Sequence, residues 1–353
     1  DTYVFTYDDL SRLTDTKQYR NGLLVNEHIE NNITYDKNGN IITLNRLDNG
    51  TYVGCYEFQY SGNQRERDIE SDAYYAYDAN GNVTEDALSG FGISYNILNL
   101  PECLQDNRGS GEISHQYWYL ADGTKEMLCD YDYIGQRYVG SLVYNAEFID
   151  SHSFESASFG DGRIVATSEG TEVHYFLTDH LGSTRVVVKE TASFPCDLDR
   201  KDYYPFGTAW KLPIMPTSDN RYTFSGKEQQ VTNYASTDFL DFGSRLYDPN
   251  GAIFLQQDPL SEKYVHIGQY NYCAGNPIKF IDLLGLDIYR YDDQTGGIVL
   301  EKITNDKYDQ IGKFKYDKKT NTYELKTNKK GEAKTRIDKI EKGILSDGMN
   351  FKT

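Results

Sequence analysis

Histidine and cysteine perform much of the chemistry in proteins, and neither is arranged for it in this chain. The six histidines show no metal-ligand spacing, and the five cysteines are odd in number and widely separated. His180 beside Asp179 has the composition of an acid–base pair, but a hairpin turn is the favoured interpretation of this dipeptide. No phosphate-binding glycine loop occurs. The sequence therefore predicts no metal and no cofactor.

Two aspartates, Asp258 and Asp282, stand in turn-forming segments towards the end of the chain. Asp258 precedes Pro259, and Asp282 lies in the run at 276–286, Asn-Pro-Ile-Lys-Phe-Ile-Asp-Leu-Leu-Gly-Leu. Asp is frequent in turns throughout this sequence, and Asp-Pro commonly opens a turn. On residue types alone, both aspartates are predicted to be turn residues.

The chain changes character directly after Leu286. Residues 287–353 carry 15 Lys and Arg against 12 Asp and Glu, a net charge of +3. Residues 1–286 carry 21 against 42, a net charge of −21. Two segments of opposite charge, joined at a short Gly-Leu element, suggest a carrier and a cargo.

Composition favours an all-β fold. The 31 tyrosines suit half-buried strand positions, and the 30 glycines supply frequent turns. The acidic body, residues 1–286, is not expected to bind nucleic acid, because it would repel phosphates. No apolar run approaches the length of a membrane helix. The chain begins at Asp1 inside a repeat, with no signal-peptide pattern, and we interpret it as a fragment of a longer protein.

A motif of the form aromatic-x-Tyr-Asp-x-x-Gly recurs along the first part of the chain. Its copies lie at residues 5–8, 33–40, 75–82, 93–96 and 117–123, and the last two match the motif less well. Alternating aromatic and polar residues before Asp-x-Asn-Gly-Asn predict a strand, a tight turn and a returning strand. Each hairpin is expected to rely on its neighbours. Equivalent strand and turn positions are predicted for the pairs Tyr7–Asp8, Tyr35–Asp36 and Tyr77–Asp78.

These residues resemble the YD repeats of the RHS family of bacterial polymorphic toxins, and of the related Tc-toxin C subunits and teneurins. Further family elements follow in order at 175–185 (with Asp-His-Leu-Gly-Ser), 204–207 (Tyr-Pro-Phe-Gly), 224–228 (Phe-Ser-Gly-Lys-Glu), 245–260 and 276–286. Within them, Lys227-Glu228 is interpreted as a surface or wall ion pair. The resemblance covers residues 1–286.

The resemblance implies a spiral of β-hairpins that forms part of a hollow shell, with a short α+β tail held inside. It divides the chain into YD/RHS repeats at 1–170, an RHS repeat-associated core domain at 171–286 and a variable, truncated effector or linker segment at 287–353. In the tail, strand-like stretches precede a short amphipathic helix marked by Ile337, Ile340 and Ile344.

In RHS and Tc-C proteins the closing motif is where the chain cuts itself, immediately after its last leucine. The resemblance therefore implies cleavage between Leu286 and Asp287. Gly285 would let the chain approach the site closely, and Leu286 would sit in a small apolar pocket. The activity would be a single-turnover, aspartyl-type self-cleavage at most.

Core aspartates are implicated in the family's cut. Carried over, this implies Asp258 and Asp282 as the catalytic carboxylates, with Arg245 as an organiser of the site. Repulsion between two shielded carboxylates would keep one protonated, to polarise the scissile carbonyl, while the other deprotonates water. Two departures predict slow or absent cleavage: Leu283 stands where the family usually has Pro, and Ala252 stands where it usually has Arg.

The resemblance implies the chain's own C-terminal effector as a partner, together with an immunity protein and secretion-system components, and a secreted or cell-surface location. The tail contains no His and no Cys, so it lacks the commonest nuclease bases and cysteine nucleophiles. Its cations could attract nucleic acid or membrane, but a solvated, balanced surface is favoured. The alternative function is an extracellular adhesion or carbohydrate-binding module without catalysis, whose exposed tyrosines stack on surface glycans.

Overall fold

A computed structural model of the chain describes residues 1–109, 111–147, 151–189, 196–211, 219–232, 236–264, 267–292, 297–300, 314–317 and 322–325. These residues form antiparallel β-strands, two 3₁₀ turns at Phe224–Gly226 and Cys273–Gly275, and no α-helix. The prediction of an all-β fold is confirmed. The helix predicted at 337–344 lies outside the described residues.

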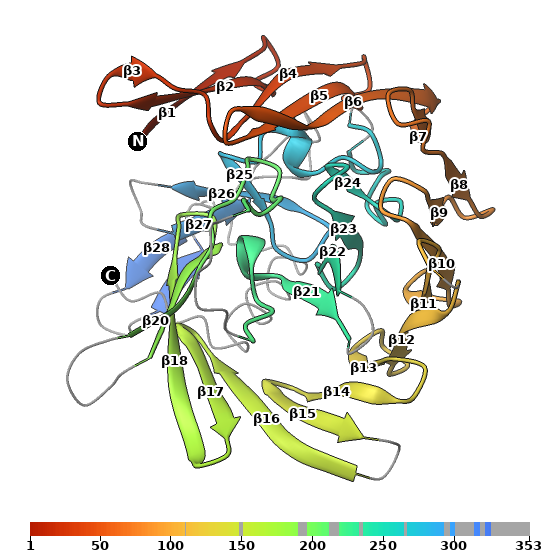
Figure 1. Cartoon of the computed structure of the whole chain (residues 1–353), viewed down its shortest axis with the longest axis vertical. Helices are drawn as coiled ribbons and strands as arrows, with labels where there is room; N and C mark the ends of the chain where they lie inside the picture. Colours follow the sequence, from red (N-terminus) through yellow and green to blue (C-terminus); the bar gives the residue numbers. More distant parts are fainter. Residues whose placement is uncertain are drawn as a thin grey trace, which may run out of the picture.

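Strands β1–β20 form a curved outer wall (Figure 1). The wall consists of β1 (Thr2–Tyr7), β2 (Leu13–Arg20), β3 (Leu23–Leu24), β4 (Ile29–Tyr35), β5 (Ile41–Asp48), β6 (Thr51–Ser61), β7 (Gln64–Asp68), β8 (Tyr75–Tyr77), β9 (Val83–Asp86), β10 (Phe91–Tyr95), β11 (Pro101–Asp106), β12 (Ile113–Tyr119), β13 (Lys125–Cys129), β14 (Ile134–Val139), β15 (Leu142–Glu147), β16 (Ser151–Phe159), β17 (Gly162–Thr167), β18 (Gly170–Thr178), β19 (Thr184–Lys189) and β20 (Cys196–Arg200). From β8 to β20 the strands pair in sequence order in one 13-stranded sheet.

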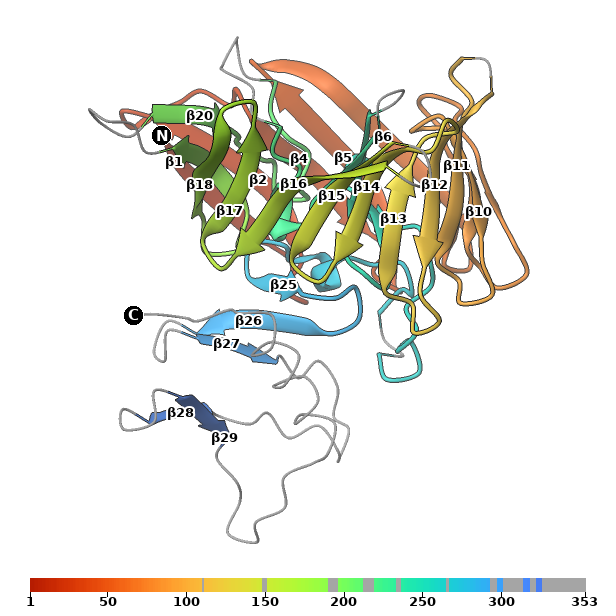
Figure 2. The same ribbon diagram turned by 90° about the horizontal axis from the view of Figure 1, so that it is seen from below.

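The strands after β20 lie inside the arc or beneath it. They are β21 (Glu228–Val231), β22 (Ser236–Asp241), β23 (Leu246–Asp248), β24 (Ile253–Phe254), β25 (Phe280–Asp282), β26 (Ile288–Asp292), β27 (Gly297–Leu300), β28 (Phe314–Asp317) and β29 (Thr322–Leu325). Strands β21–β24 and β25–β27 form two small sheets. Seen from below, β26–β29 extend away from the wall (Figure 2).

The repeated Tyr-Asp turns have one shared geometry. The Oδ1 atom of Asp36 accepts the backbone N–H groups of Asn38 and Asn40, both at 2.8 Å. The Asp78 and Asp8 carboxylates accept the equivalent pairs of N–H groups at 2.9–3.0 Å. Gly39 takes the position with positive φ, at +85°, which glycine adopts without strain. The predicted equivalence of these turns is confirmed.

Bulges beside these turns explain why the wall curves. An extra residue in one strand bends it and increases its twist. In six hairpins the pairing register shifts in the last step before the turn, between Thr6 and Tyr7, Thr34 and Tyr35, Ala76 and Tyr77, Ser94 and Tyr95, Trp118 and Tyr119, and Leu177 and Thr178. Because these hairpins bulge at the same place, the bends accumulate along the wall.

Apolar side chains of the wall pack against the inner strands. In one cluster, wall residues such as Phe91 and Leu104 meet Phe239 and Leu255 of the inner segment. A second cluster joins the first wall strands to β22–β25 and is rich in aromatic rings. Burial of this surface, at roughly 25 cal/mol per Å² of apolar area, holds the wall and the inner strands together.

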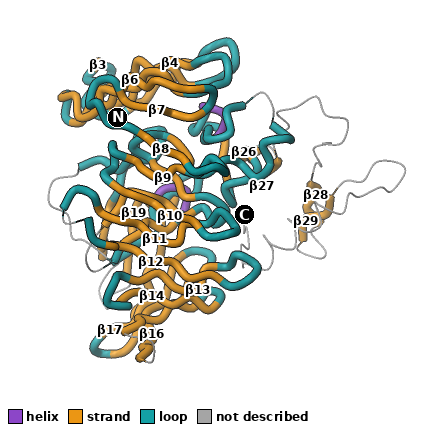
Figure 3. Tube along the Cα trace, turned by 90° about the vertical axis from the view of Figure 1, so that its right-hand side faces the viewer, coloured by secondary structure: helices purple, strands orange, loops and turns teal. Residues whose placement is uncertain are grey.

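The segment before β25 also docks on turns of the wall. Figure 3 shows the strands that follow it, β26 and β27, to one side of the wall. The segment's side chains donate to turn carbonyls: Asn276 Nδ2 to Ser11 (2.6 Å), Asn271 Nδ2 to Gly39 (2.8 Å) and Tyr270 Oη to Gly81 (2.5 Å). These contacts set the position of the closing segment relative to the repeats. No helix within the described ranges has the length and apolarity needed to span a membrane.

Candidate functional site

The residues implied by the sequence come together where the inner sheets meet. Arg245 directly precedes β23, Asp258 lies in the loop after β24, and Asp282 is the last residue of β25. The loop 283–287 then connects β25 to β26, so it contains the bond between Leu286 and Asp287. Antiparallel pairing of Asp282 with Ile288 closes this loop into a hairpin.

Arg245 is the centre of the site. Its Nη2 atom lies 3.4 Å from Oδ2 of Asp282 and 3.5 Å from Oδ2 of Asp258, so one nitrogen bridges both carboxylates. Its Nη1 atom donates to the carbonyl of Gln269 at 3.2 Å, and the guanidinium stacks over the Phe254 ring at 3.7 Å. Arg245 is 3% exposed. A buried guanidinium with several acceptors is held in one orientation.

The Asp282 carboxylate shapes the loop that follows it. Its Oδ1 atom accepts the backbone N–H groups of Leu284 (3.2 Å) and Leu286 (3.1 Å). This is the spacing at which Asp36 holds its own turn. Asp282 is therefore a turn residue, as its residue type predicts, and at the same time it faces Arg245. The structural and the chemical interpretations of this residue are compatible.

Donors from the inner segment hold the loop from the other side. The carbonyls of three successive loop residues accept hydrogen bonds: Leu283 from Lys227 Nζ (2.6 Å), Leu284 from the backbone N–H of Ser244 (3.2 Å) and Gly285 from Arg245 Nε (2.6 Å). The loop is thus fixed through its backbone, on both the N–H and the carbonyl side, up to the residue before Leu286.

Gly285 is required by two features of the loop. Its φ is +68°, in the left-handed region, and a Cβ atom at this position would lie 3.3 Å from Arg245 N, Arg245 Cβ and Phe242 Cβ. Glycine allows both the conformation and the close approach. The expectation that Gly285 brings the chain close to the site agrees with this geometry.

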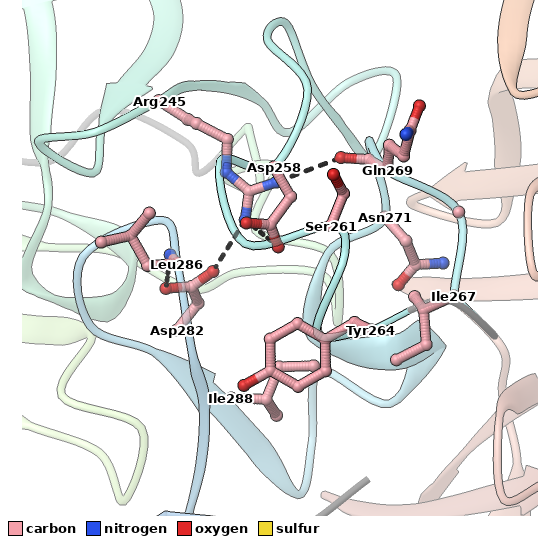
Figure 4. Close-up of a pocket in the computed structure, with 11 residues that line it drawn as sticks. Arg245, Asp258, Ser261, Tyr264, Ile267, Gln269, Asn271, Asp282, Leu286 and Ile288 are labelled. Atoms are coloured by element: carbon pink, nitrogen blue, oxygen red, sulfur yellow. Dashed lines mark hydrogen bonds and ion pairs between the residues drawn. The ribbon is translucent and has the colours of Figure 1, made fainter. Parts of the chain in front are cut away.

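A small pocket lies between the two carboxylates and the loop (Figure 4). Its free volume, about 10 Å³ for the centre of a water-sized sphere, is near the lower limit for a single water molecule. It is lined by Arg245, Asp258, Ser261, Tyr264, Ile267, Gly268, Gln269, Asn271, Asp282, Leu286 and Ile288. Leu286 therefore shares the pocket with both aspartates and with two isoleucines.

The residue on the far side of the Leu286–Asp287 bond is anchored as well. Oδ1 of Asp287 accepts hydrogen bonds from Lys263 Nζ at 2.6 Å and from the Tyr264 hydroxyl at 2.5 Å. Ile288 then pairs with Asp282 and is 8% exposed. Both sides of this bond are consequently held in place.

Burial dominates the electrostatics of the carboxylates. It raises the pKa of Asp282, and the charge of Arg245 opposes that rise. Burial also raises the pKa of Asp258; Arg245 opposes the rise, and the charge of Asp287 adds to it. Both carboxyls thus keep a proton to a higher pH than exposed aspartates do. Such a pair can hold one acid and one base.

Other candidates from the sequence have structural roles. The Asp179 carboxylate accepts the N–H groups of Leu181 and Ser183, both at 3.0 Å, which supports the turn interpretation of Asp179-His180. Ala252, where the resembling family usually has Arg, is buried in the core and is not part of the pocket lining. Across the described residues, no group of three or more His, Cys, Asp or Glu could hold a metal.

The sequence did not reveal the roles of Lys227, Lys263 and Tyr264. Glu228 does form a wall ion pair, with Lys125 at 2.7 Å, but Lys227 turns instead towards the loop carbonyl of Leu283. No local pattern marks these contacts, because each joins residues at least 23 positions apart.

The fold of this chain is similar to folds seen in solved structures of other proteins. No protein-family profile matches the chain. Among solved structures it is similar to the Photorhabdus luminescens Tc holotoxin pore, with a TM-score of 0.62 and 16% identity over 86% of this chain and 15% of that one. It is also similar to the TcdB2-TccC3 complex (TM-score 0.60, 17% identity, 80% of this chain and 16% of that one). A further similar structure is TcdB2-TccC3 without its hypervariable C-terminal region (TM-score 0.60, 16% identity, 80% and 15%).

One curated protein is similar in sequence. Salivary gland surface protein 1 of Aedes aegypti is 30% identical over 180 residues, which are 50% of this chain and 5% of that protein. The chain therefore spans only a small part of each of these proteins. The structural likeness establishes the fold: the curved wall and the strands inside it are arranged as in part of the Tc-toxin chains.

Proposed function

We propose that this chain is the closing part of an RHS-type toxin shell that cuts itself between Leu286 and Asp287. The observation that carries the proposal is the meeting of Arg245, Asp258 and Asp282 at the loop that contains this bond. The Tc-type fold supports it. The break in charge after Leu286 supports it as well, because the name of one similar solved structure mentions a hypervariable C-terminal region.

The chemistry proposed is hydrolysis of one peptide bond. The ionised carboxylate removes a proton from a water molecule while the protonated carboxyl donates to the carbonyl oxygen of Leu286. The water oxygen bonds to the carbonyl carbon and forms a tetrahedral intermediate. Its collapse breaks the C–N bond, and the nitrogen of Asp287 leaves as an amine with the proton taken from water. The hydroxyl proton of the intermediate returns to the other carboxylate, so the pair is restored.

The chain's own residues supply orientation. Arg245 bridges the two carboxylates and holds the carbonyl of Gly285, while Asp282 holds the N–H of Leu286. Fixing the reacting groups in this way contributes to the rate without new chemistry. This proposal includes the division into domains at residues 170 and 286 and a C-terminal effector. It also includes an immunity protein, secretion components and a secreted or cell-surface location.

Intact-mass spectrometry of the purified chain tests the cut. We expect a C-terminal fragment that begins at Asp287 and forms without added protease, slowly because Leu283 and Ala252 depart from the family's pattern. Asp282→Asn and Asp258→Asn should each abolish it. Asp130→Asn is the matched control, since the buried Asp130 carboxylate also accepts two turn N–H groups, both at 3.0 Å, but lies on the wall. A fragment in both site variants, or none in the wild type, would refute the proposal.

A second function has one observation in its favour. The similar Aedes aegypti protein is named as a surface protein, and the wall exposes several tyrosines, including Tyr52 and Tyr74 at 57% and 56%. Such rings can stack on sugars. A non-catalytic adhesion module would give reproducible hits on a glycan array, reduced by Tyr52→Ala or Tyr74→Ala, and no cleavage.

A further inference from the structure

Lys227 is half-buried and its amine lies against the closing loop, although nothing in its local sequence calls for a cation there. Its Nζ atom donates to the carbonyl of Leu283 at 2.6 Å and lies 5.2 Å from the centre of the Phe242 ring. Leu283 stands three residues before Leu286, on the strand-proximal side of the loop. A lysine ammonium in such a place loses hydration, so its hydrogen bond must compensate for that loss.

The same amine interacts electrostatically with Asp282, one of the two site carboxylates. Burial lowers the pKa of Lys227, and the charges of Asp282 and Asp241 oppose that change. Reciprocally, the charge of Lys227 acts with that of Arg245 against the burial that raises the pKa of Asp282. The charged and titratable groups around Asp282 are Arg245, Lys227, the Cys273 thiol, the Tyr289 hydroxyl and Asp258, which shares Arg245 Nη2 with it.

We propose that Lys227 is a positioning residue of the cleavage loop, which fixes the Leu283 carbonyl and places a positive charge beside Asp282. This inference rests on the proposed self-cleavage. The Lys227 contact is the first of the three carbonyl contacts along the loop, ahead of those made by Ser244 and Arg245. Without it, the loop would be held only at its later residues, and the N–H groups of Leu284 and Leu286 would be less firmly directed at Asp282.

Two variants separate this role from a general contribution to folding. Lys227→Met removes the donor and the charge but keeps an apolar chain over Phe242. Lys227→Arg keeps both. Lys201→Met is the matched control, because Lys201 is also half-buried and donates to a backbone carbonyl, that of Asn220 at 3.4 Å, away from the loop.

The first measurement is the rate of the cut as a function of pH. Lys227→Met should slow cleavage by about tenfold or more, since small misplacements of reacting groups have effects of this size. It should also move a limb of the pH profile of the carboxyl pair to higher pH by about one unit, because losing the positive charge beside Asp282 raises the pKa of this carboxyl. Lys227→Arg should restore both. A rate and a pH profile unchanged in Lys227→Met would overturn the inference and leave the proposed self-cleavage intact.

The second measurement does not need cleavage. Hydrogen exchange of the Leu284 and Leu286 amides, which donate to Asp282, should be faster in Lys227→Met, restored in Lys227→Arg and unchanged in Lys201→Met. If the wild type does not cut itself, the proposed function fails and this measurement alone decides: equal exchange in all four proteins overturns the inference. If Lys227→Met does not fold, Lys227→Leu, which also removes the donor and the charge, replaces it in both measurements.

Discussion

Arg245 holds Asp282 and the loop that Asp282 organises at the same time. Its Nη2 atom lies 3.4 Å from the Asp282 carboxylate, and its Nε atom donates to the carbonyl of Gly285, three residues further on, at 2.6 Å. The carboxylate and the backbone that it orders are thus fixed to one rigid guanidinium. A change at Arg245 should therefore affect both.

Replacing Arg245 should stop cleavage. Arg245→Met leaves the buried Asp282 and the half-buried Asp258 without their shared cation, so the pKa of each should rise further and the pair should lose its base at a pH where the wild type still has one. We expect stability to fall by about 3 to 5 kcal/mol, as when one partner of a buried ion pair is removed. Intact mass and urea unfolding measure the two effects. Arg245→Lys is the control that keeps the positive charge. Cleavage at the wild-type rate in Arg245→Met would contradict the proposed role of Arg245 in the cut.

The pH dependence of the cut should be a bell. Below the lower pKa of the pair both carboxyls are protonated and no base remains; above the upper pKa both are ionised and no acid remains. Because burial raises the pKa of Asp258 and of Asp282, both limbs should lie above the ordinary pKa of aspartate. Single-turnover rates across the pH range test this. A rate that rises steadily with pH would indicate a different nucleophile.

Proline at Leu283 should accelerate cleavage by a few-fold. Proline favours an extended conformation in the residue before it, and Asp282 already ends a strand, so the substitution pre-orders the loop entry. Leu284→Pro is the contrasting control, because it removes the N–H that donates to Asp282 at 3.2 Å and should slow the cut. The yield of the C-terminal fragment over time distinguishes Leu283→Pro from Leu284→Pro. Slower cleavage in Leu283→Pro would mean that the loop needs freedom at this residue.

Gly285→Ala should reduce stability and cleavage by more than backbone strain alone would. The new Cβ would stand 3.3 Å from Arg245 and Phe242, in addition to the cost of φ at +68°, about 1 to 2 kcal/mol. Gly140→Ala is a close control, since Gly140 has φ of +61° with no atom within 4 Å of the added carbon. Thermal unfolding and cleavage should show a larger loss for Gly285→Ala. Equal losses would mean that only φ matters.

A second carboxyl pair should make the fold less stable as pH rises. Asp86 and Asp248 are both fully buried, and burial together with the charge of Asp86 raises the pKa of Asp248 to about 7. Between the ordinary pKa of aspartate and pH 7, the folded chain therefore keeps a proton that the unfolded chain releases. Stability falls with rising pH over this range.

Asp86→Asn should reduce that fall by about 1 kcal/mol or more, because it removes the neighbouring charge. The substitution keeps the oxygen that accepts the N–H of Ser89. Unfolding free energies in urea at about pH 5 and pH 8 give the difference. The exposed Asp72→Asn is the control. Parallel behaviour of Asp86→Asn and wild type would show that the two carboxyls are not coupled.

Much of the fold follows from local sequence. In Asp-x-Asn-Gly-Asn the aspartate accepts N–H groups two and four residues on, and the glycine takes a positive φ, so each turn depends on five adjacent residues. The all-β fold and the equivalence of the Tyr7, Tyr35 and Tyr77 hairpins could be predicted for this reason. The candidate site residues came instead from a family resemblance, since on residue types alone Asp258 and Asp282 are turn formers.

The sequence by itself determined the repeated hairpins and the break in charge after Leu286, because both depend on neighbouring residues and on composition. Only the tertiary structure decided that Arg245 bridges Asp258 and Asp282, that Lys227 reaches Leu283, and that Asp287 is held by Lys263 and Tyr264. These contacts join segments 13 to 56 residues apart along the chain. Their partners are chosen by how the inner strands pack within the curved wall, and no local pattern encodes that packing.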